Sequence, residues 1–458
     1  MRPLSVFALI VLLVFPALNQ AAAQAPQPVE VETFVLDNGL KVVVVPERRV
    51  PVVTHMLWYK VGSADEERGE SGIAHFFEHL MFKRTETREE GAFDAAVKAV
   101  GGNQNAFTTQ DYTAYFQQVP PDALGEMMAF EADRMENLIL DEQAIETERR
   151  VVMEERLQRV DNRPFGILNE AVDATLYKNH PYGIPVIGWM HEIEALDRDE
   201  LVAFYERYYT PNNAVLVVAG DIDAETVRRL ASETYGRIPP GPDLPPRVRP
   251  MEPEPRTVRS VTLHDPRASL PSFIRQWFAP AYFSEQGKTA DALQVLTEIL
   301  GGGSRSRLYQ ELVVKSQIAS AVSAWTGVGR LDYSSVGIYA QSNDTAELDE
   351  VERVIEAEIA KIAAEGVSEK ELETAKNVLA SRLILNNNDQ MSRAMEYGVT
   401  LVTGGTVDDL GKTRERIEAV TVEDVRAAAR AYLGNRRGVT GYLLPEEADT
   451  ASEQEDPA

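Results

Sequence analysis

The chain has 458 residues, no cysteine and a formal net charge of −26. This length is too great for one ordinary core and indicates two or more domains, while the acidic charge opposes contact with phosphate backbones, so we expect no nucleic-acid partner. Because cysteine is absent, disulfides, thiol nucleophiles and cysteine-ligated metals are excluded, and any metal must be held by histidine and carboxylate.

Residues 1–23 have the pattern of an export signal. A positive residue, Arg2, precedes an apolar run from 4 to 18, and small residues ending at Ala23 offer a cleavage site. The alternative is an uncleaved anchor, for which the apolar run is short. We therefore expect an exported protein with no stable membrane anchor after signal cleavage, periplasmic if the source is a Gram-negative bacterium.

A proline-rich segment, 239–257, divides the remaining chain into two parts of similar size. Prolines at this density exclude helix and central strand, and they favour an extended, stiff linker. We expect an N-terminal domain over 24–238 and a C-terminal domain over 258–444. The last residues, 445–458, contain acids and no base, which predicts a disordered tail.

Two blocks of sequence recur in the two parts at a nearly constant offset. The first predicts one helix from 193 to 208 followed by the strand 214–219, and the second predicts one helix from 417 to 432 followed by the strand 439–443. Matched blocks at one offset indicate a duplicated domain.

A second pair of matched positions supports the duplication. Asp111-Tyr112 and Asp332-Tyr333 lie at nearly the same offset, and each pair precedes a predicted strand and a long predicted helix. Single pairs of this kind also arise by chance, so the inference depends on their common spacing.

Strands and helices mix within each part. In the first part, the strands are expected at 31–36, 40–45 and 52–60, and the helices at 71–82, 121–137 and 141–160. Only Asp37-Asn38-Gly39 separates the first two strands, and so short a turn favours an antiparallel hairpin. The predicted fold class is α+β, with two homologous domains that each pack helices on a largely antiparallel sheet.

The segment 75–79 reads His-Phe-Phe-Glu-His. On a helix, His75 and His79 project from one face about a turn apart, so both rings can reach a single ion. Glu78 shares that face and can take a proton from water without being a ligand. This is the inverted form of the zincin motif. The alternative is a pair of helix histidines that pack beside phenylalanines.

A hydrolytic zinc needs three protein ligands and one position for water. The remaining histidines are isolated, and we interpret them as structural or surface residues: His55, His180, His191 and His264. The acidic helix over 146–157 is a better candidate for supplying the third ligand. Glu148 and Glu155 lie two turns apart on one face of it, while Glu154 points elsewhere. A solvated acidic face explains this helix equally well.

These residues resemble the pitrilysin/insulinase family of zinc peptidases, and in particular its short bacterial, mitochondrial-processing-peptidase-like branch. The resemblance covers nearly all of the mature chain. It rests on five segments: 72–85, 101–108, 148–155, 180–188 and 300–312. The implied fold has two homologous α+β domains that enclose a chamber, with 24–238 as the zinc-binding peptidase domain.

The resemblance also implies roles for individual residues. One Zn²⁺ per chain is expected to be held by His75, His79 and Glu155. Glu78 is implied as the general base and Glu148 as a supporting acid near the metal. Asn105, Ala106 and Phe107 match an edge strand on which the peptide substrate lies as an added strand.

The chain departs from the family pattern at two positions. Relatives carry an arginine and a tyrosine in the second half that steady the substrate carbonyl and the oxyanion, and Val313 and Ser320 stand at those places. In related bacterial pairs, one subunit carries the zinc motif and a homologous subunit carries the arginine and tyrosine. The resemblance therefore implies a zinc-bearing subunit with a homologous partner, as a heterodimer, or a homodimer.

The predicted function is a zinc-dependent endopeptidase that hydrolyses peptides or unfolded protein segments. The alternative is a non-catalytic structural subunit of the same fold, although the metal motifs of such subunits are typically degraded. A receptor that only binds peptide is disfavoured, because a general base poised beside a metal serves no binding purpose.

Overall fold

The computed structural model describes residues 31–446 except 285, 328, 387 and 388. The predicted export signal lies outside this range, as do residues 447–458. The tail prediction was wrong at Pro445, which ends strand β11 (Gly438–Pro445) and pairs with Asp265; a strand tolerates proline at its end, where no further ladder bond is needed. Within the described part of the chain, no helix is long and apolar enough to cross a membrane.

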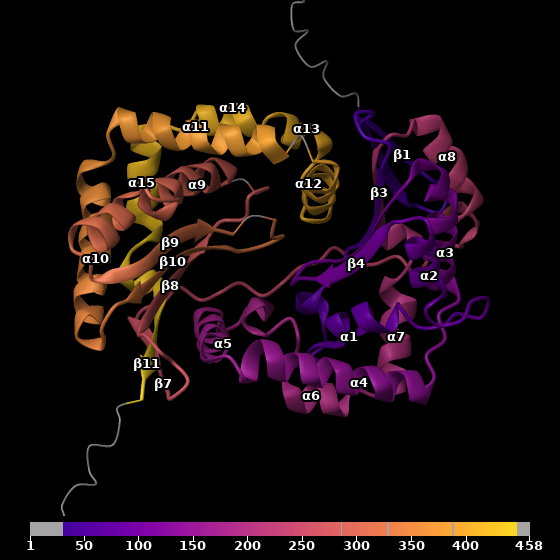
Figure 1. Ribbon diagram of the computed structural model, residues 1–458, viewed down its shortest axis with the longest axis horizontal. Helices are drawn as coiled ribbons and strands as arrows, with labels where there is room; N and C mark the ends of the chain where they lie inside the picture. Colours follow the sequence, from indigo (N-terminus) through magenta and orange to yellow (C-terminus); the bar gives the residue numbers. More distant parts are fainter. Residues whose placement is uncertain (1–30, 285, 328, 387–388, 447–458) are drawn as a thin grey trace, which may run out of the picture.

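The first half forms a six-stranded sheet with the spatial order β1-β2-β6-β3-β5-β4 (Figure 1). Its strands are β1 (Glu32–Val35), β2 (Lys41–Pro46), β3 (Val53–Tyr59), β4 (Asn103–Thr108), β5 (Thr113–Val119) and β6 (Ala214–Gly220). The predicted hairpin is confirmed, since β1 and β2 pair antiparallel across the short turn. Only β2 and β6 pair in parallel.

The second half forms a five-stranded sheet with the order β7-β11-β8-β10-β9. Its other strands are β7 (Arg259–Asp265), β8 (Ser272–Ala279), β9 (Ala319–Thr326) and β10 (Ser334–Ser342). Its one parallel pair joins β7 and β11, the first and last strands in chain order, just as β2 pairs with the last strand of the first sheet. The α+β class and the duplication are confirmed, because among the described strands β1 alone has no counterpart in the other sheet.

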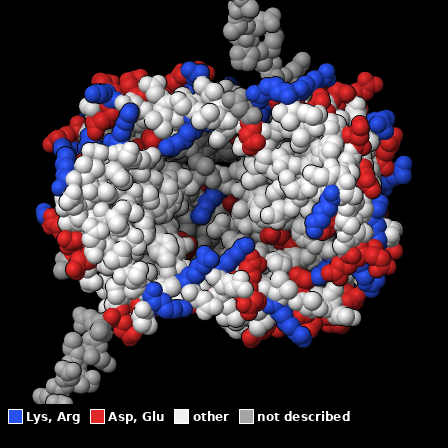
Figure 2. All heavy atoms as spheres, in the orientation of Figure 1, with Lys and Arg blue, Asp and Glu red and all other residues white. Residues whose placement is uncertain are grey.

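Helices accompany the sheet in both halves. Those of the first half are α1 (Ile73–Leu80), α2 (Ala92–Ala99), α3 (Leu124–Glu136), α4 (Glu142–Arg156), α5 (Pro164–Leu176), α6 (Met190–Ala195), α7 (Arg198–Tyr208) and α8 (Ala224–Glu233). Those of the second are α9 (Gly287–Gly301), α10 (Leu348–Glu365), α11 (Glu369–Asn386), α12 (Gln390–Val402), α13 (Val407–Gly411), α14 (Thr413–Glu418) and α15 (Val422–Tyr432). The two halves face each other across a central hollow (Figure 2).

The prediction of one helix over 193–208 was wrong, and so was its counterpart over 417–432. The structure has two helices at each place, α6 and α7 in the first half and α14 and α15 in the second. A capping box starts each second helix, with Asp197 at the N-cap of α7 and Thr421 at the N-cap of α15. These side chains satisfy the free amides of a new helix start and so end the preceding helix.

Each sheet is covered on one face by a helix from the other half. Helix α12 packs against β2, β3 and β6, and α5 packs against β7, β8 and β11. Val42 and Val44 of β2 face the core of the first half, whereas Val43 and Val45 face α12. A strand buried on both faces reads as a continuous apolar run rather than an alternation, and each buried valine contributes roughly 1.5–3 kcal/mol.

The segment between the halves is held by charged side chains. No helix or strand lies between 238 and 258. Arg249 in this segment contacts the buried carboxylate of Asp111, and its guanidinium also lies 2.9 Å from Asp65 and 4.0 Å from Asp332. The two acids that the duplication relates, Asp111 and Asp332, therefore meet at one arginine of the linker.

Candidate metal centre and peptide cleft

The helix that carries the two motif histidines, α1, begins directly after Gly72, whose φ of 91° lies in the left-handed region. A Cβ at this position would lie 2.6 Å from the carbonyl oxygen of Ile187, so only glycine allows this approach. The carboxylate of Glu66 accepts hydrogen bonds from the amides of Gly72 and Ala74 at 3.1 and 3.0 Å. These contacts satisfy amides that a helix start leaves free and fix the origin of α1.

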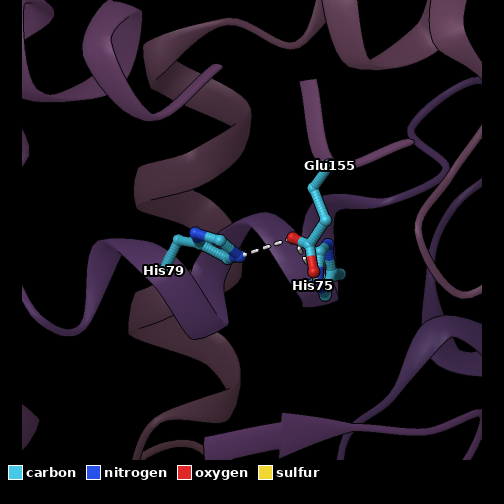
Figure 3. Close-up of side chains that lie close together, drawn as sticks. All are labelled: His75, His79 and Glu155. Atoms are coloured by element: carbon cyan, nitrogen blue, oxygen red, sulfur yellow. Dashed lines mark hydrogen bonds and ion pairs between the residues drawn. The ribbon is translucent and has the colours of Figure 1, made fainter. Parts of the chain in front are cut away.

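Three side chains from α1 and α4 converge at one point. The Nε2 atoms of His75 and His79 lie 3.5 and 3.1 Å from Oε2 of Glu155, and one ligand atom from each residue lies within 4.8 Å of the others. Figure 3 shows the Glu155 carboxylate turned toward the two imidazoles. Glu154, the neighbouring acid, is exposed and instead accepts a hydrogen bond from Gln158.

Glu148 orients the second histidine. Its carboxylate lies 3.2 Å from Nδ1 of His79 and 2.5 Å from the ammonium of Lys83. Burial alone would raise the pKa of Glu148, but the hydrogen bonds from His79 and Lys83 outweigh burial and lower its pKa. An ionised Glu148 favours the proton on Nδ1 of His79 and leaves Nε2 directed at Glu155.

Glu78 lies beside this cluster and points into the same cavity. Its Oε2 accepts a 2.6 Å hydrogen bond from the hydroxyl of Thr108 on β4. Burial raises the pKa of Glu78, and the Thr108 hydrogen bond offsets part of that shift. A carboxylate with a raised pKa is suited to accept and return a proton near neutral pH.

The donor set fits a zinc ion. Burial lowers the pKa of His75 to about 3, so this ring is neutral, as a metal ligand must be. Burial would also lower the pKa of His79, but the carboxylates of Glu148 and Glu155 outweigh it and raise that pKa, so His79 must lose a proton to bind a metal. The Nδ1 atom of His75 is buried without a hydrogen-bond partner among the described residues, so the ring of His75 lacks the orienting contact that Glu148 gives to His79. Two imidazole nitrogens and one carboxylate oxygen are the ligands of many catalytic zinc sites.

The chain leaves α-helical geometry two residues after Glu155, at the end of α4. The segment Leu157–Asp161 is a π-helix, and within it the guanidinium of Arg159 lies 2.7 Å from Oε1 of Glu155. Insertions of this kind are frequent at functional sites. Arg159, Lys83 and Thr108 were not predicted from the sequence. Arg159 lies four positions after Glu155, and Lys83 lies four positions after His79, and this spacing places helical side chains together.

His75, His79 and Glu155, here called the metal cluster, form one wall of a cavity of about 570 Å³, and β4 forms another. Asn105, Ala106 and Phe107 all line this cavity. Strand β4 is the last strand of its sheet, so its outer edge pairs with no other described strand. The Ala106 amide donates a 2.9 Å hydrogen bond to the Asn105 side chain. In Figure 1, β4 and α1 lie on the side of the first half that faces the second.

The two positions that depart from the family pattern lie in the second half, outside the lining of this cavity. Val313 lies in the π-helix Tyr309–Lys315 and packs against the core of the second half. Ser320 lies on β9, where its hydroxyl contacts Gln341. Neither residue lines the cavity beside the metal cluster.

None of the four isolated histidines lines this cavity. His55 is buried, with its ring nitrogens 2.5 Å from Gln117 and 2.9 Å from the Tyr235 hydroxyl. His180 is also buried and lies 3.4 Å from Asp332. These rings have partners in the protein, which agrees with a structural role.

Comparison with known proteins places the chain in a family. The family model described as Insulinase (Peptidase family M16) matches residues 41–189, and the Peptidase M16 inactive domain model matches residues 195–379. The zinc protease PqqE of Helicobacter pylori is 32% identical over 422 residues, which cover 90% of this chain and 93% of that protein. The chain belongs to peptidase family M16, the insulinase family. The resemblance seen in the sequence is thus confirmed.

Other members of this family extend the likeness. An uncharacterized zinc protease of Mycobacterium bovis is 33% identical over 430 residues, 92% of this chain and 93% of the relative. The crystal structure of a protease from Helicobacter pylori superposes with a TM-score of 0.86 at 30% identity, over 91% of this chain and 100% of the other. The relatives' names support a peptidase-like function. All residues of the metal cluster lie in the segment that the first M16 model matches.

Proposed function

We propose that this M16 protein is a zinc-dependent endopeptidase that hydrolyses peptides or unfolded protein segments. The observation that carries the proposal is the convergence of His75, His79 and Glu155 at one point, with the carboxylate of Glu78 in the same cavity. A metal held by three protein ligands beside a general base is the arrangement that metal-assisted hydrolysis needs.

The three converging residues would hold the zinc ion. Bound there, zinc supplies a Lewis acid that activates water and polarises the scissile carbonyl. Glu148 keeps His79 in the ligating tautomer, and Lys83 keeps Glu148 ionised and in place. These roles follow from contacts between side chains of this chain.

Glu78 acts as the general base. Its carboxylate takes a proton from the attacking water and returns it to the amine that leaves when the peptide bond breaks. The Thr108 hydroxyl donates to Oε2 of Glu78 and holds the carboxylate at the cavity wall. Because Thr108 belongs to β4, the same strand positions the base and lines the route of the substrate.

The substrate binds along the edge of β4. An extended peptide can add to this strand through backbone hydrogen bonds, which are independent of sequence and suit unfolded segments. Asn105, Ala106 and Phe107 then contact the peptide, and the Ala106 amide exchanges the Asn105 side chain for a substrate carbonyl.

Catalysis also requires a homologous partner subunit. Val313 and Ser320 carry no group that can donate strongly to an oxyanion from the second half. The mitochondrial-processing peptidase subunit beta of Blastocladiella emersonii is 26% identical over 88% of this chain, and its name describes one subunit of an enzyme. We therefore favour a heterodimer over a homodimer.

A second candidate is a non-catalytic subunit. The match of the second half to a model described as an inactive domain favours this reading for that half. Catalysis by the first half is favoured by its intact set of motif residues, which are His75, Glu78, His79 and Glu155. Export, to the periplasm if the source is a Gram-negative bacterium, with cleavage after residue 23, also belongs to this proposal, and sequencing the N-terminus of the mature protein tests the cleavage.

Zinc content and peptide cleavage test the proposal together. The purified chain should bind one zinc ion, and an unfolded polypeptide should be cleaved only when a homologous subunit with the arginine and tyrosine is added. A chelator should abolish that cleavage and added zinc should restore it. Zinc binding without cleavage in any combination would favour the non-catalytic subunit. A chain without zinc affinity would contradict both the proposed metal site and the proposed zinc-dependent cleavage.

A further inference from the structure

A second cavity, of about 560 Å³, lies where the linker crosses the first half. Its wall combines Lys60, directly after β3, with Arg207 at the end of α7 and with linker residues from 243 to 249. It shares no lining residue with the cavity at the metal cluster. Nothing in the proposed peptidase reaction uses it.

Lys60 is a partly buried cation without a counterion in the described part of the chain. No hydrogen bond or ion pair joins its ammonium to any described residue. Burial lowers the pKa of Lys60, and the positive charges of Arg247 and Lys41 lower it further. A cation whose charged neighbours are cations is stabilised by binding an anion.

Two more cations of this cavity are only weakly compensated. Arg247 donates to the backbone carbonyls of Asp111 and Val402, and its closest carboxylate, that of Asp65, is 3.7 Å away. Arg207 lies 3.6 Å from Glu67, whose side chain is 72% exposed, so water screens the pair.

The lining acids offset these cations only in part, since four cations and two acids line the cavity. The acids are Asp65, which pairs with Arg249 at 2.9 Å, and Asp243, which makes no described ion pair. The cavity is therefore locally positive in a chain whose net charge is −26. An excess of positive charge in a cavity raises the local concentration of anions.

We propose that this cavity binds a small tetrahedral oxyanion, such as phosphate or a phosphate monoester, between Lys60, Arg207 and Arg247. The anion joins the end of β3, the end of α7 and the linker through charge-assisted hydrogen bonds. Since the linker also carries Arg249, which contacts acids from both halves, occupancy of this cavity stabilises the crossing between the halves.

Binding of inorganic phosphate to the full mature chain tests the proposal. At fixed ionic strength, calorimetry should show saturable binding to the wild type, and Lys60→Gln should weaken it by about tenfold or more, as expected for loss of one charged hydrogen bond. Lys98→Gln is the matched control, because that lysine is 72% exposed and pairs with Asp94 on the surface. Equal affinity of the two variants, or no saturable binding to the wild type, overturns the proposal.

A second variant covers the case in which Lys60→Gln does not fold. Arg207 has a 48% exposed side chain, so Arg207→Gln should fold normally and still weaken phosphate binding. Unchanged affinity in that variant also overturns the proposal. Glycerol phosphate distinguishes the sources, since a site for phosphate esters binds it at least as well as inorganic phosphate. The readout is independent of peptide cleavage, so it stands or fails separately from the proposed peptidase activity.

Discussion

The Nε2 atom of His79 lies 3.1 Å from Oε2 of Glu155, although 76 positions separate the two residues in the chain. The contact joins α1 to α4, which also pack against each other through their apolar residues. The fold thus brings the three candidate ligands together, so ordering them is part of folding.

Replacing the general base should separate metal binding from catalysis. Glu78→Gln keeps the size of the side chain and the contact with Thr108 but cannot accept a proton. Peptide hydrolysis, measured with the homologous subunit present, should fall by about 10²–10⁴-fold, while zinc content measured by elemental analysis stays at the wild-type value. Cleavage at the wild-type rate by Glu78→Gln would remove Glu78 from the mechanism.

The support that Glu148 gives to His79 should appear in zinc affinity. Glu148→Gln removes the negative charge that holds Nδ1 of His79 and pairs with Lys83. The zinc dissociation constant, measured by competition with a chelator, should rise by about 10–100-fold. Glu146→Gln is the control, because Glu146 lies on the same helix with a 52% exposed side chain and contacts only arginines. An equal effect of both substitutions would contradict the role.

The contact between α12 and the first sheet should be sensitive to one methyl group. A Cβ at Gly398 would lie 1.9 Å from Cε2 of Trp58, a fully buried side chain. Gly398→Ala should therefore lower the free energy of unfolding by about 1–3 kcal/mol, even though alanine favours helix over glycine.

Chemical denaturation measures this effect, with Gly411→Ala as the control. Gly411 ends α13, and a Cβ there meets no atom within 4 Å. If Gly398→Ala is as stable as the control, α12 does not pack on Trp58 as closely as the structure has it.

The pH dependence of stability should report on Asp173 in α5. Burial raises the pKa of Asp173 to about 6, against the attraction of Arg330. The folded protein therefore holds this proton more tightly than the unfolded chain, so the contribution is favourable below about pH 4 and is lost as the pH rises through 6.

An amide at this position removes the charge. Asp173→Asn should raise the free energy of unfolding above pH 6 by about 1 kcal/mol, since part of the side chain still reaches water. Below pH 4 the variant and the wild type should unfold alike. Asp37→Asn, an exposed turn residue, should change stability equally little at both pH values. A constant difference between Asp173→Asn and wild type across this range would contradict the raised pKa.

Local patterns predicted most of the elements. The valine run of β2 and the hairpin turn after β1 specified strands, and the predicted helices over 71–82 and 121–137 correspond to α1 and α3. The break between α6 and α7 was missed because a capping box at Asp197 is compatible with a helix that simply continues, so apolar periodicity alone does not reveal it.

The candidate site was predictable only where its residues are close in sequence. His75, Glu78 and His79 share one helix, so their spacing in the sequence predicts that their side chains lie on one face. Glu148 and Glu155 were equally placed on their own helix, and packing of α4 against α1 determines that Glu155 meets both rings while Glu148 reaches the far side of His79. The contacts of Thr108 depend on sheet register, which no local pattern specifies.

The exchange of α5 and α12 has a consequence for the integrity of the molecule. Each half, expressed alone, would present an uncovered apolar sheet face to water and would be prone to aggregate. After proteolytic scission within 239–257, by contrast, both fragments should stay associated as one noncovalent particle. The chain connection at the linker is then dispensable once the two parts have interlocked, and covalent continuity matters mainly during assembly.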